Sequence, residues 1–93
     1  MFKTNEYFDG QVKSLAFETP EGLATIGVMA KGEYIFGTSS VEHMTVISGT
    51  MEVLLPGEEV WKIFKEFETF IVPKGYEFKV KVDRDTGYRC YYR

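Results

Sequence analysis

The sequence predicts an all-β fold, a sandwich or barrel built from short strands. Apolar and polar residues alternate with a period of two along most of the 93 residues, which is the pattern of half-buried strands. Turn-forming residues interrupt this alternation roughly every 8 to 12 residues, a spacing typical of all-β domains. No segment shows the 3.6-residue period of an amphipathic helix.

The expected strands follow one another along the whole chain. Alternation marks residues 11–18, 23–30, 32–38, 44–48, 51–55, 59–65, 68–73, 76–82 and 87–93. In residues 76–82 it places Phe78, Val80 and Val82 on one face, which we expect to be buried. Gly49 and Thr50 separate two strands by two residues, and this spacing predicts a hairpin.

Composition limits the domain organisation and the classes of function. The length predicts one domain over residues 1–93, and 44% hydrophobic residues supply a core. The net charge is −3 and the basic residues are scattered, which argues against a nucleic-acid surface. No apolar run reaches the ~18 residues of a membrane span or resembles a signal peptide. Cys90 is the single cysteine, which suits a reducing compartment, so we expect a cytoplasmic protein.

Two short motifs in the right order predict a single cupin-type jelly-roll barrel. Residues 42–49, EHMTVISG, fit the E-x6-G ending of the first cupin motif, and residues 73–75, PKG, fit the P-x-G of the second. Each motif alone is weak, but their order, their separation and the strand pattern around them agree. One departure is Phe67, which stands where the second motif has a glycine.

In this sequence other residues replace the histidine ligands of the cupin metal site. Phe36, Thr38 and Phe78 occupy the three positions where a metal-binding cupin carries histidines. Glu42 alone remains, and a lone carboxylate is a poor site for zinc, iron or manganese. Strand alternation points His43 away from Glu42. We therefore expect no metal.

Five stretches of the chain together resemble one small family. They are NEYFDGQVKS (5–14), GVMAKGEYIF (27–36), EHMTVISGTMEVLLP (42–56), FIVPKGYEF (70–78) and YRCYY (88–92). The chain resembles the pyrimidine/purine nucleoside phosphorylase family, whose members are single cupin domains of about this length. The resemblance covers essentially all of the chain.

The resemblance implies a pentosyltransferase of broad specificity that acts in nucleotide salvage. Inorganic phosphate would cleave the N-glycosidic bond of purine and pyrimidine nucleosides and give a free base and ribose 1-phosphate. Phosphate would be the co-substrate, with no cofactor and no metal. The expected partners are nucleosides and phosphate, with no nucleic acid and no membrane, and size and family lead us to expect a homodimer.

The reaction and the cupin positions together suggest roles for individual residues. Glu42 is the candidate catalytic residue, as a proton donor to the base or a ligand of the ribose hydroxyls; the alternative is a rim carboxylate in a salt bridge. Lys13 and Arg89 are the candidate phosphate-binding residues, because phosphate needs cationic donors. A solvated strand lysine is the ordinary alternative for Lys13.

The candidate substrate-binding residues are Tyr34, Phe36, Thr38 and Phe78. Aromatic rings could form the wall against which a base stacks, although plain core packing explains each phenylalanine equally well. Thr38 could donate to a phosphate or ribose oxygen, or could reflect ordinary strand propensity. Three further tyrosines could line the cavity or a dimer contact, and the sequence does not decide between these for Tyr7, Tyr88 and Tyr92.

Three other functions compete with the phosphorylase. A cupin of this kind could bind a small, nucleoside-type ligand without turning it over. An aromatic-rich sheet could instead serve as an interaction module. A metal-dependent dioxygenase or isomerase is the third alternative, and the missing histidines count against it.

Overall fold

The computed structural model describes residues 1–93 as ten β-strands without a helix. The strands are β1 (Lys3–Tyr7), β2 (Val12–Thr19), β3 (Gly22–Met29), β4 (Gly32–Gly37), β5 (Glu42–Ser48), β6 (Met51–Leu54), β7 (Lys62–Phe64), β8 (Thr69–Val72), β9 (Glu77–Val82) and β10 (Thr86–Tyr92). The predicted all-β fold is confirmed. Since the structure contains no helix, it has none that is long and apolar enough to cross a membrane.

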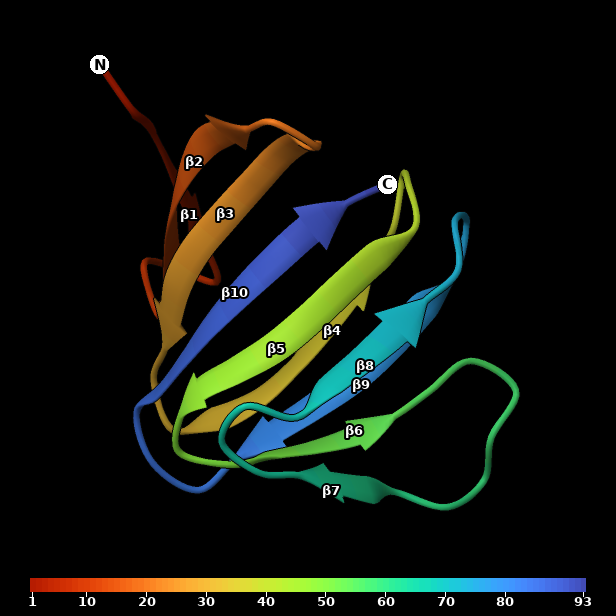
Figure 1. The fold of residues 1–93 in the computed structure, drawn as a ribbon. Coiled ribbons are helices and arrows are strands. Elements are labelled where there is room, and N and C mark those ends of the chain that lie inside the picture. The colour runs from red at the N-terminus through yellow and green to blue at the C-terminus, as the bar shows by residue number, and fades with distance from the viewer.

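The strands form two antiparallel sheets that face each other (Figure 1). One sheet has six strands in the order β1-β2-β3-β10-β5-β8, and the other has four in the order β4-β9-β6-β7. The C-terminal end of β10 lies beside the loop between β4 and β5, where the Arg93 N–H donates to the Val41 carbonyl at 2.7 Å. The two halves of the chain are therefore interleaved, and β10 lies near the middle of the larger sheet.

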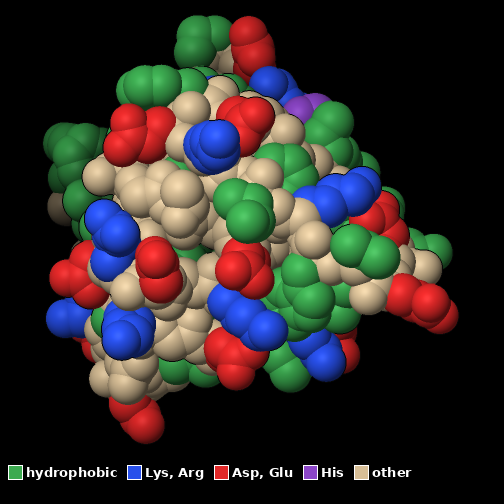
Figure 2. Space-filling view, turned by 90° about the horizontal axis from the view of Figure 1, so that it is seen from below, with side chains coloured by type: hydrophobic (Ala, Val, Ile, Leu, Met, Phe, Trp, Pro, Cys, Tyr) green, Lys and Arg blue, Asp and Glu red, His purple; other side chains and the backbone are tan.

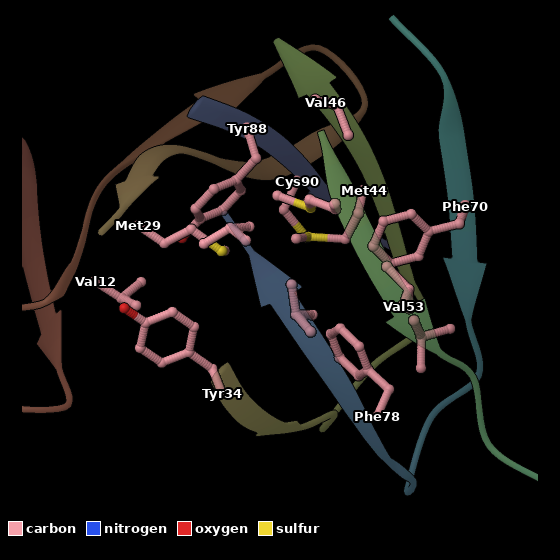
Figure 3. Close-up of a cluster of buried hydrophobic side chains, with 14 residues drawn as sticks. Val12, Met29, Tyr34, Met44, Val46, Val53, Phe70, Phe78, Tyr88 and Cys90 are labelled. Carbon is pink, nitrogen blue, oxygen red and sulfur yellow. The ribbon is translucent and has the colours of Figure 1, made fainter. Parts of the chain in front are cut away.

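The hydrophobic core fills the space between the two sheets. Figure 3 shows Tyr88, Cys90 and Met44 of the six-stranded sheet pointing toward Tyr34 and Phe78 of the four-stranded sheet. The fully buried residues include Val12, Met29, Val46, Met51, Val53, Val72, Val80 and Phe78. The prediction that the Phe78 face of β9 is buried is confirmed, because strand alternation sends every second side chain inward.

The structure corrects the hairpin that Gly49 and Thr50 predicted. β5 pairs with β10 and β8, whereas β6 pairs with β9 and β7 in the other sheet. The two residues therefore form a crossing between the sheets and not a hairpin turn. Gly49 has φ of 90°, and an added Cβ would lie 2.8 Å from Thr86 Oγ1, so this sharp crossing needs glycine. Residues 59–65 were also predicted as one strand, but only Lys62–Phe64 forms one.

The turn between β1 and β2 has an unusual backbone. Phe8, Asp9 and Gly10 have φ values of 53°, 56° and 84°, which lie in the left-handed region that side chains other than glycine rarely adopt. This geometry closes a tight connection between the two strands. The last residue of β1, Tyr7, is paired with the first residue of β2, Val12. The turn holds the Phe8 ring against Tyr34 and Phe36, with ring centroids 5.0 and 5.6 Å away.

Charged residues of both signs are mixed on the surface. Figure 2 shows the molecule from below, with Lys and Arg side chains interspersed among Asp and Glu side chains and no block of one sign on this face. The ion pairs are exposed, as between Lys62 and Glu58 at 3.1 Å, and such pairs contribute little to stability.

Candidate functional site

A cavity of about 320 Å³ lies between the two sheets, next to the filled core. Its size falls within the range of about 300–1,000 Å³ that is typical of small-molecule sites. Its lining is mostly apolar and aromatic, with a few polar groups: Tyr7, Phe8, Ser14, Met29, Ile35, Phe36, Gly37, Ser39, Glu42, Met44, Phe78, Tyr88 and Tyr92. This combination is the one that binds and orients small organic ligands.

Glu42 is the only charged residue that lines the cavity. It begins β5, and its register opposite Tyr92 of β10 turns its carboxyl group inward. Burial raises the pKa of the Glu42 carboxyl above its ordinary value, and the hydrogen bond from Cys90 only partly opposes this. The Cys90 thiol donates to Glu42 Oε1 at 3.7 Å. Burial therefore favours the neutral, proton-donating form of this carboxyl group more than water does.

The neighbours of Glu42 on β10 remain neutral. Burial raises the pKa of Cys90 to about 12 and that of Tyr88 to about 12, and it also raises the pKa of Tyr92. The Tyr92 and Thr25 hydroxyl groups share a hydrogen bond of 3.0 Å. Around neutral pH these groups therefore act as thiol and hydroxyl donors or acceptors, not as anions.

One side of the cavity is an aromatic wall. Phe36 of β4 lies between Phe8 and Phe78, with ring centroids 5.6 Å from each. The Phe8 ring is about two-fifths exposed, at 43%, and it belongs to the left-handed turn between β1 and β2. Flat, partly exposed rings of this kind can stack against a planar heterocycle.

Gly27 makes room for Tyr88, which lines the opposite side. An added Cβ at Gly27 would lie 2.6 Å from Tyr88 Cζ and 2.8 Å from the Lys13 carbonyl oxygen. The two residues are paired across β3 and β10. The glycine lets the tyrosine ring lie flat over the sheet, so its hydroxyl end reaches over β3 toward β2.

The structure brings together three of the predicted site residues. Glu42, Phe36 and Phe78 all line the cavity, although they come from three different strands. The other four candidates do not line it. The Tyr34 hydroxyl donates to the Ala30 carbonyl at 2.6 Å, so it supports the core.

Thr38 ties two loops together and does not line the cavity. Its hydroxyl donates to the Pro73 carbonyl at 2.7 Å and accepts from the Tyr76 N–H at 3.1 Å. These bonds join the loop after β4 to the turn before β9. At this position, where metal-binding cupins carry a ligand, this chain therefore has a residue that holds two loops together.

The two predicted phosphate residues lie on the outer face of the six-stranded sheet. Lys13 is exposed and pairs with Glu6 at 3.5 Å. Arg89 donates to Thr45 Oγ1 at 3.2 Å, and its guanidinium lies 4.5 Å from the Tyr91 ring centroid. Strand alternation places both side chains on the face opposite Glu42 and Tyr88. Their binding of phosphate stays a prediction.

Several lining residues were not among the candidates. The three tyrosines whose place the sequence left open, Tyr7, Tyr88 and Tyr92, all line the cavity. Ser14 was also missed, although its position in the alternation puts it on the inner face, where a polar residue is a signal. Ser39 belongs to a loop, and no periodic signal could have placed it there.

The cavity does not fit a metal ion. Its donor set is the Glu42 carboxyl, the Cys90 thiol beside it and tyrosine hydroxyls. No three His, Cys, Asp or Glu side chains lie together as a possible metal site. Structural and catalytic metal sites need three or four such ligands.

Comparisons with known proteins identify relatives along the whole chain. The chain matches the model of the pyrimidine/purine nucleoside phosphorylase family over residues 2–92. It is 56% identical over 93 residues to a pyrimidine/purine nucleoside phosphorylase of Pseudomonas paraeruginosa, with 100% of both chains covered. A protein of the same name from Cellvibrio japonicus is 53% identical over 99% of each chain.

Solved structures are similar over the same length. A protein of unknown function from Vibrio parahaemolyticus has a TM-score of 0.96 at 40% identity, covering 100% of this chain and 99% of that one. An RmlC-like cupin from Shewanella frigidimarina has a TM-score of 0.75 at 18% identity, covering 96% and 80%, and at that identity it supports the fold alone. The fold is therefore a cupin-type barrel, as the two motifs predicted. With a family match and close relatives along its whole length, the chain belongs to the pyrimidine/purine nucleoside phosphorylase family.

Proposed function

We propose that the chain is a cytoplasmic nucleoside phosphorylase that accepts both purine and pyrimidine nucleosides. It would use one cupin domain over residues 1–93 and neither a metal nor an organic cofactor. The observation that carries this proposal is Glu42, a carboxyl group whose pKa is raised by burial, inside a cavity with an aromatic wall. The names of its relatives support the same activity.

The proposed reaction breaks the bond between C1′ of the ribose and a nitrogen of the base. The electron pair of that bond leaves with the base, and protonated Glu42 donates a proton to it, which lowers the barrier to departure. A phosphate oxygen forms the new bond to C1′. The cationic sugar in the transition state resembles that of glycoside hydrolysis. The proton of hydrogen phosphate then restores Glu42, so the products are neutral base and ribose 1-phosphate.

The cavity has suitable surfaces for both parts of a nucleoside. The base would stack on the wall formed by Phe8, Phe36 and Phe78, and stacking tolerates purines and pyrimidines alike because every base has a flat π-face. The ribose hydroxyls would meet polar groups on the opposite side, at Ser14 and Tyr88. Broad specificity follows because the wall recognises the flat shape of a base and not its pattern of hydrogen-bonding groups.

The test is an assay for free base. Purified protein is treated with EDTA and incubated with adenosine, guanosine, uridine and cytidine, with and without phosphate. We expect base release that requires phosphate and survives chelation. If no nucleoside releases base at any phosphate concentration, the proposal is wrong. Activity that EDTA abolishes and iron or manganese restores would contradict the metal-free mechanism.

A nucleoside-binding protein without catalysis is the second candidate. One observation favours it: no cationic side chain lines the cavity, and a binding protein has no need to hold phosphate. The same assay separates the two functions. A nucleoside that binds in calorimetry but never releases base in the presence of phosphate would indicate the binding protein.

We also propose that the chain forms a homodimer through the outer face of its six-stranded sheet. Leu15, Ile26 and Val28 lie together there and are 48%, 49% and 58% exposed, and Leu15 pairs with Ile26 across β2 and β3. Arg89 on the same face has a buried Nε without a hydrogen-bond partner. Buried donors are normally paired, but the chain itself already covers this atom, so what favours the contact is the apolar surface that a second copy could remove from water.

The dimer is tested by molar mass in solution. Light scattering should give twice the chain mass for the unmodified protein and the chain mass for Ile26→Glu, because a buried carboxylate in the contact is unfavourable. Ile63→Glu is the matched control, since Ile63 is 60% exposed on the other sheet, and it should remain dimeric. A monomeric unmodified protein, or a dimeric Ile26→Glu variant, would contradict this interface.

A further inference from the structure

The proposed reaction needs a place for phosphate that the inner cavity does not supply. Glu42 is its only charged lining residue, and phosphate is positioned by cationic or N–H donors. The two cationic candidates from the sequence, Lys13 and Arg89, have side chains on the opposite face of the sheet. The phosphate donors therefore have to be found at the entrance to the cavity.

A second hollow opens directly beside the cavity. Its volume is about 750 Å³, and it shares three wall residues with the cavity, Tyr7, Ser39 and Tyr92. The two hollows therefore adjoin along these three residues. The outer hollow also contains Lys3 and Asn5 of β1 and Ser40 of the loop between β4 and β5. Lys3 is the only cationic side chain that lines either hollow.

Strand register explains why Lys3 faces this space. Lys3 is paired with Ala16, and Ala16 with Thr25, so these residues share one row across the sheet. Ala16 and Thr25 line the outer hollow too. Two residues along β1, Asn5 is paired with Ser14, which lines the inner cavity. The inner face of β1 therefore leads from Lys3 to the cavity wall.

Lys3 is also free to bind an anion. The salt bridges of the chain involve Lys13, Lys62, Lys81, Arg84 and Arg93, and none involves Lys3. Near it, the Asn5 amide donates to Ser14 Oγ at 3.5 Å, a long bond that leaves a second amide hydrogen for a ligand.

One acidic residue limits where an anion could lie. Glu18 lines the outer hollow, and its carboxylate would repel phosphate. Along β2, Glu18 follows Ala16 in the direction away from Ser14, so it lies on the side of the Lys3 row opposite Asn5 and Ser14. A phosphate ion would be favoured on the Asn5 side of Lys3, away from this carboxylate.

We propose that Lys3 binds the phosphate co-substrate at the entrance to the cavity, with Asn5 and Ser39 as further donors. This inference rests on the proposed phosphorylase function. Phosphate held there faces the shared wall at Tyr7 and Tyr92, and a nucleoside in the inner cavity would present its ribose to the same wall. Glu42 would act on the base from β5, which three strands separate from β1 in the six-stranded sheet, so nucleophile and acid approach the sugar from different directions.

Kinetics with varied phosphate test this assignment. Lys3→Gln should raise the phosphate KM by about tenfold or more, since it removes a hydrogen bond to a charged group, and should leave the nucleoside KM within about twofold. Lys3→Arg should recover part of the loss by keeping the charge. Lys79→Gln is the matched control, an exposed strand lysine on the other sheet, and should behave as the unmodified protein.

Two outcomes of this experiment would overturn the inference while the phosphorylase function stands. One is an active Lys3→Gln variant with an unchanged phosphate KM. The other is a Lys13→Gln or Arg89→Gln variant that raises the phosphate KM when Lys3→Gln does not. The first result would remove Lys3 from the phosphate site, and the second would place phosphate on the outer face of the sheet.

Direct binding separates a failure of this inference from a failure of the proposed function. Line broadening in phosphorus NMR reports binding of inorganic phosphate without any turnover. We expect broadening with the unmodified protein and with Lys79→Gln, and its loss with Lys3→Gln. If the protein releases no base but shows this pattern, the phosphate site stands and the catalytic function falls. Broadening that persists in Lys3→Gln overturns the site.

Discussion

The space between the two sheets has a filled part and a hollow part, and the same strands build both. In the filled part, Val46, Met51 and Val53 have no exposed surface. In the hollow part, Glu42 and Tyr92 border a cavity of about 320 Å³. Backbone pairing continues through both parts without a break in β9, where Phe78 lines the cavity and Val80 and Val82 belong to the core.

The difference between the two parts predicts that this barrel separates stability from the proposed function along its strands. Close packing of apolar side chains supplies the stability. The hollow part gives up some of that packing and has a half-buried carboxyl group, a thiol and hydroxyl groups in its place. Substitutions in the two parts should consequently have different effects, and the following predictions test that separation.

The largest expected effect is on catalysis in the hollow part. Glu42→Gln should lower kcat by about 100- to 10,000-fold, because the amide cannot donate the proton that the leaving base needs. The urea midpoint should not fall, since the amide occupies the same space without a charge to bury. Steady-state kinetics and urea unfolding measure the two effects. Glu66→Gln, in an exposed turn, is the matched control, and full activity of Glu42→Gln would remove the acid role.

The pH dependence of Glu42 has a definite sign. Its pKa is raised above 4.5 in the folded chain, so its contribution to stability is complete below 4.5 and is lost as the pH rises through the folded pKa. The proton-donor role predicts that kcat also falls as the pH rises through that pKa. Both changes should be absent in Glu42→Gln, which thermal unfolding and pH–rate profiles can show. A pH profile that Glu42→Gln leaves unaltered would assign the titration to phosphate instead.

A substitution in the filled part should do the reverse. Met51→Ala removes a fully buried side chain, which should lower the free energy of unfolding by about 2–5 kcal/mol. The kcat of the molecules that remain folded should be unchanged, because Met51 does not line the cavity. Urea unfolding, monitored by the fluorescence of Trp61, measures the stability. Kinetics normalised to the concentration of active sites measure kcat. A proportional loss of kcat would mean that the two parts are coupled.

Gly27 lies at the boundary, and its substitution should affect both properties. Gly27→Ala places a methyl group about 2.6 Å from Tyr88 Cζ, so the ring or the strand must move, at a cost of about 1–3 kcal/mol. Displacement of Tyr88 should also raise the nucleoside KM. Gly87→Ala is a suitable control, since no atom lies closer than 3.8 Å to an added Cβ there and Gly87 does not line the cavity. Unchanged stability and KM in Gly27→Ala would show that Tyr88 can move freely.

The sequence was sufficient for the fold but not for the connections between strands. Alternation placed Phe78, Val80 and Val82 inside, because each strand has one buried face. The hairpin predicted at Gly49 and Thr50 was wrong, because a two-residue link fits both a hairpin and a crossing between sheets. Only the partners of β5 and β6, which are distant in sequence, decide between these.

The site could be predicted only where cupin positions and alternation both applied. Glu42, Phe36 and Phe78 came from the motif spacing and line the cavity. Lys13 and Arg89 were chosen for charge and family position, and alternation alone would have placed them opposite Glu42. Sequence could not reveal that the Thr38 hydroxyl bonds to two loop residues, because those partners lie 35 and 38 residues away.

The smallest expected effect concerns Phe67, which closes the turn beside the filled part. Phe67 has φ of 68°, and its N–H donates to the Val46 carbonyl at 2.7 Å. A residue with a Cβ in this conformation costs about 1–2 kcal/mol, and its ring is 74% exposed, so little packing offsets that cost. Glycine, which the cupin motif has at this position, removes the strain but costs backbone entropy.

Phe67→Gly should therefore raise the free energy of unfolding by less than about 1 kcal/mol, and kcat should not change. Urea unfolding of Phe67→Gly and Phe67→Ala separates the causes, because alanine removes the ring but keeps the strained backbone. We expect glycine to be more stable than alanine. If the two variants were equally destabilised, the Phe67 ring would be contributing packing that its exposure conceals, and the turn would belong to the filled part of the barrel.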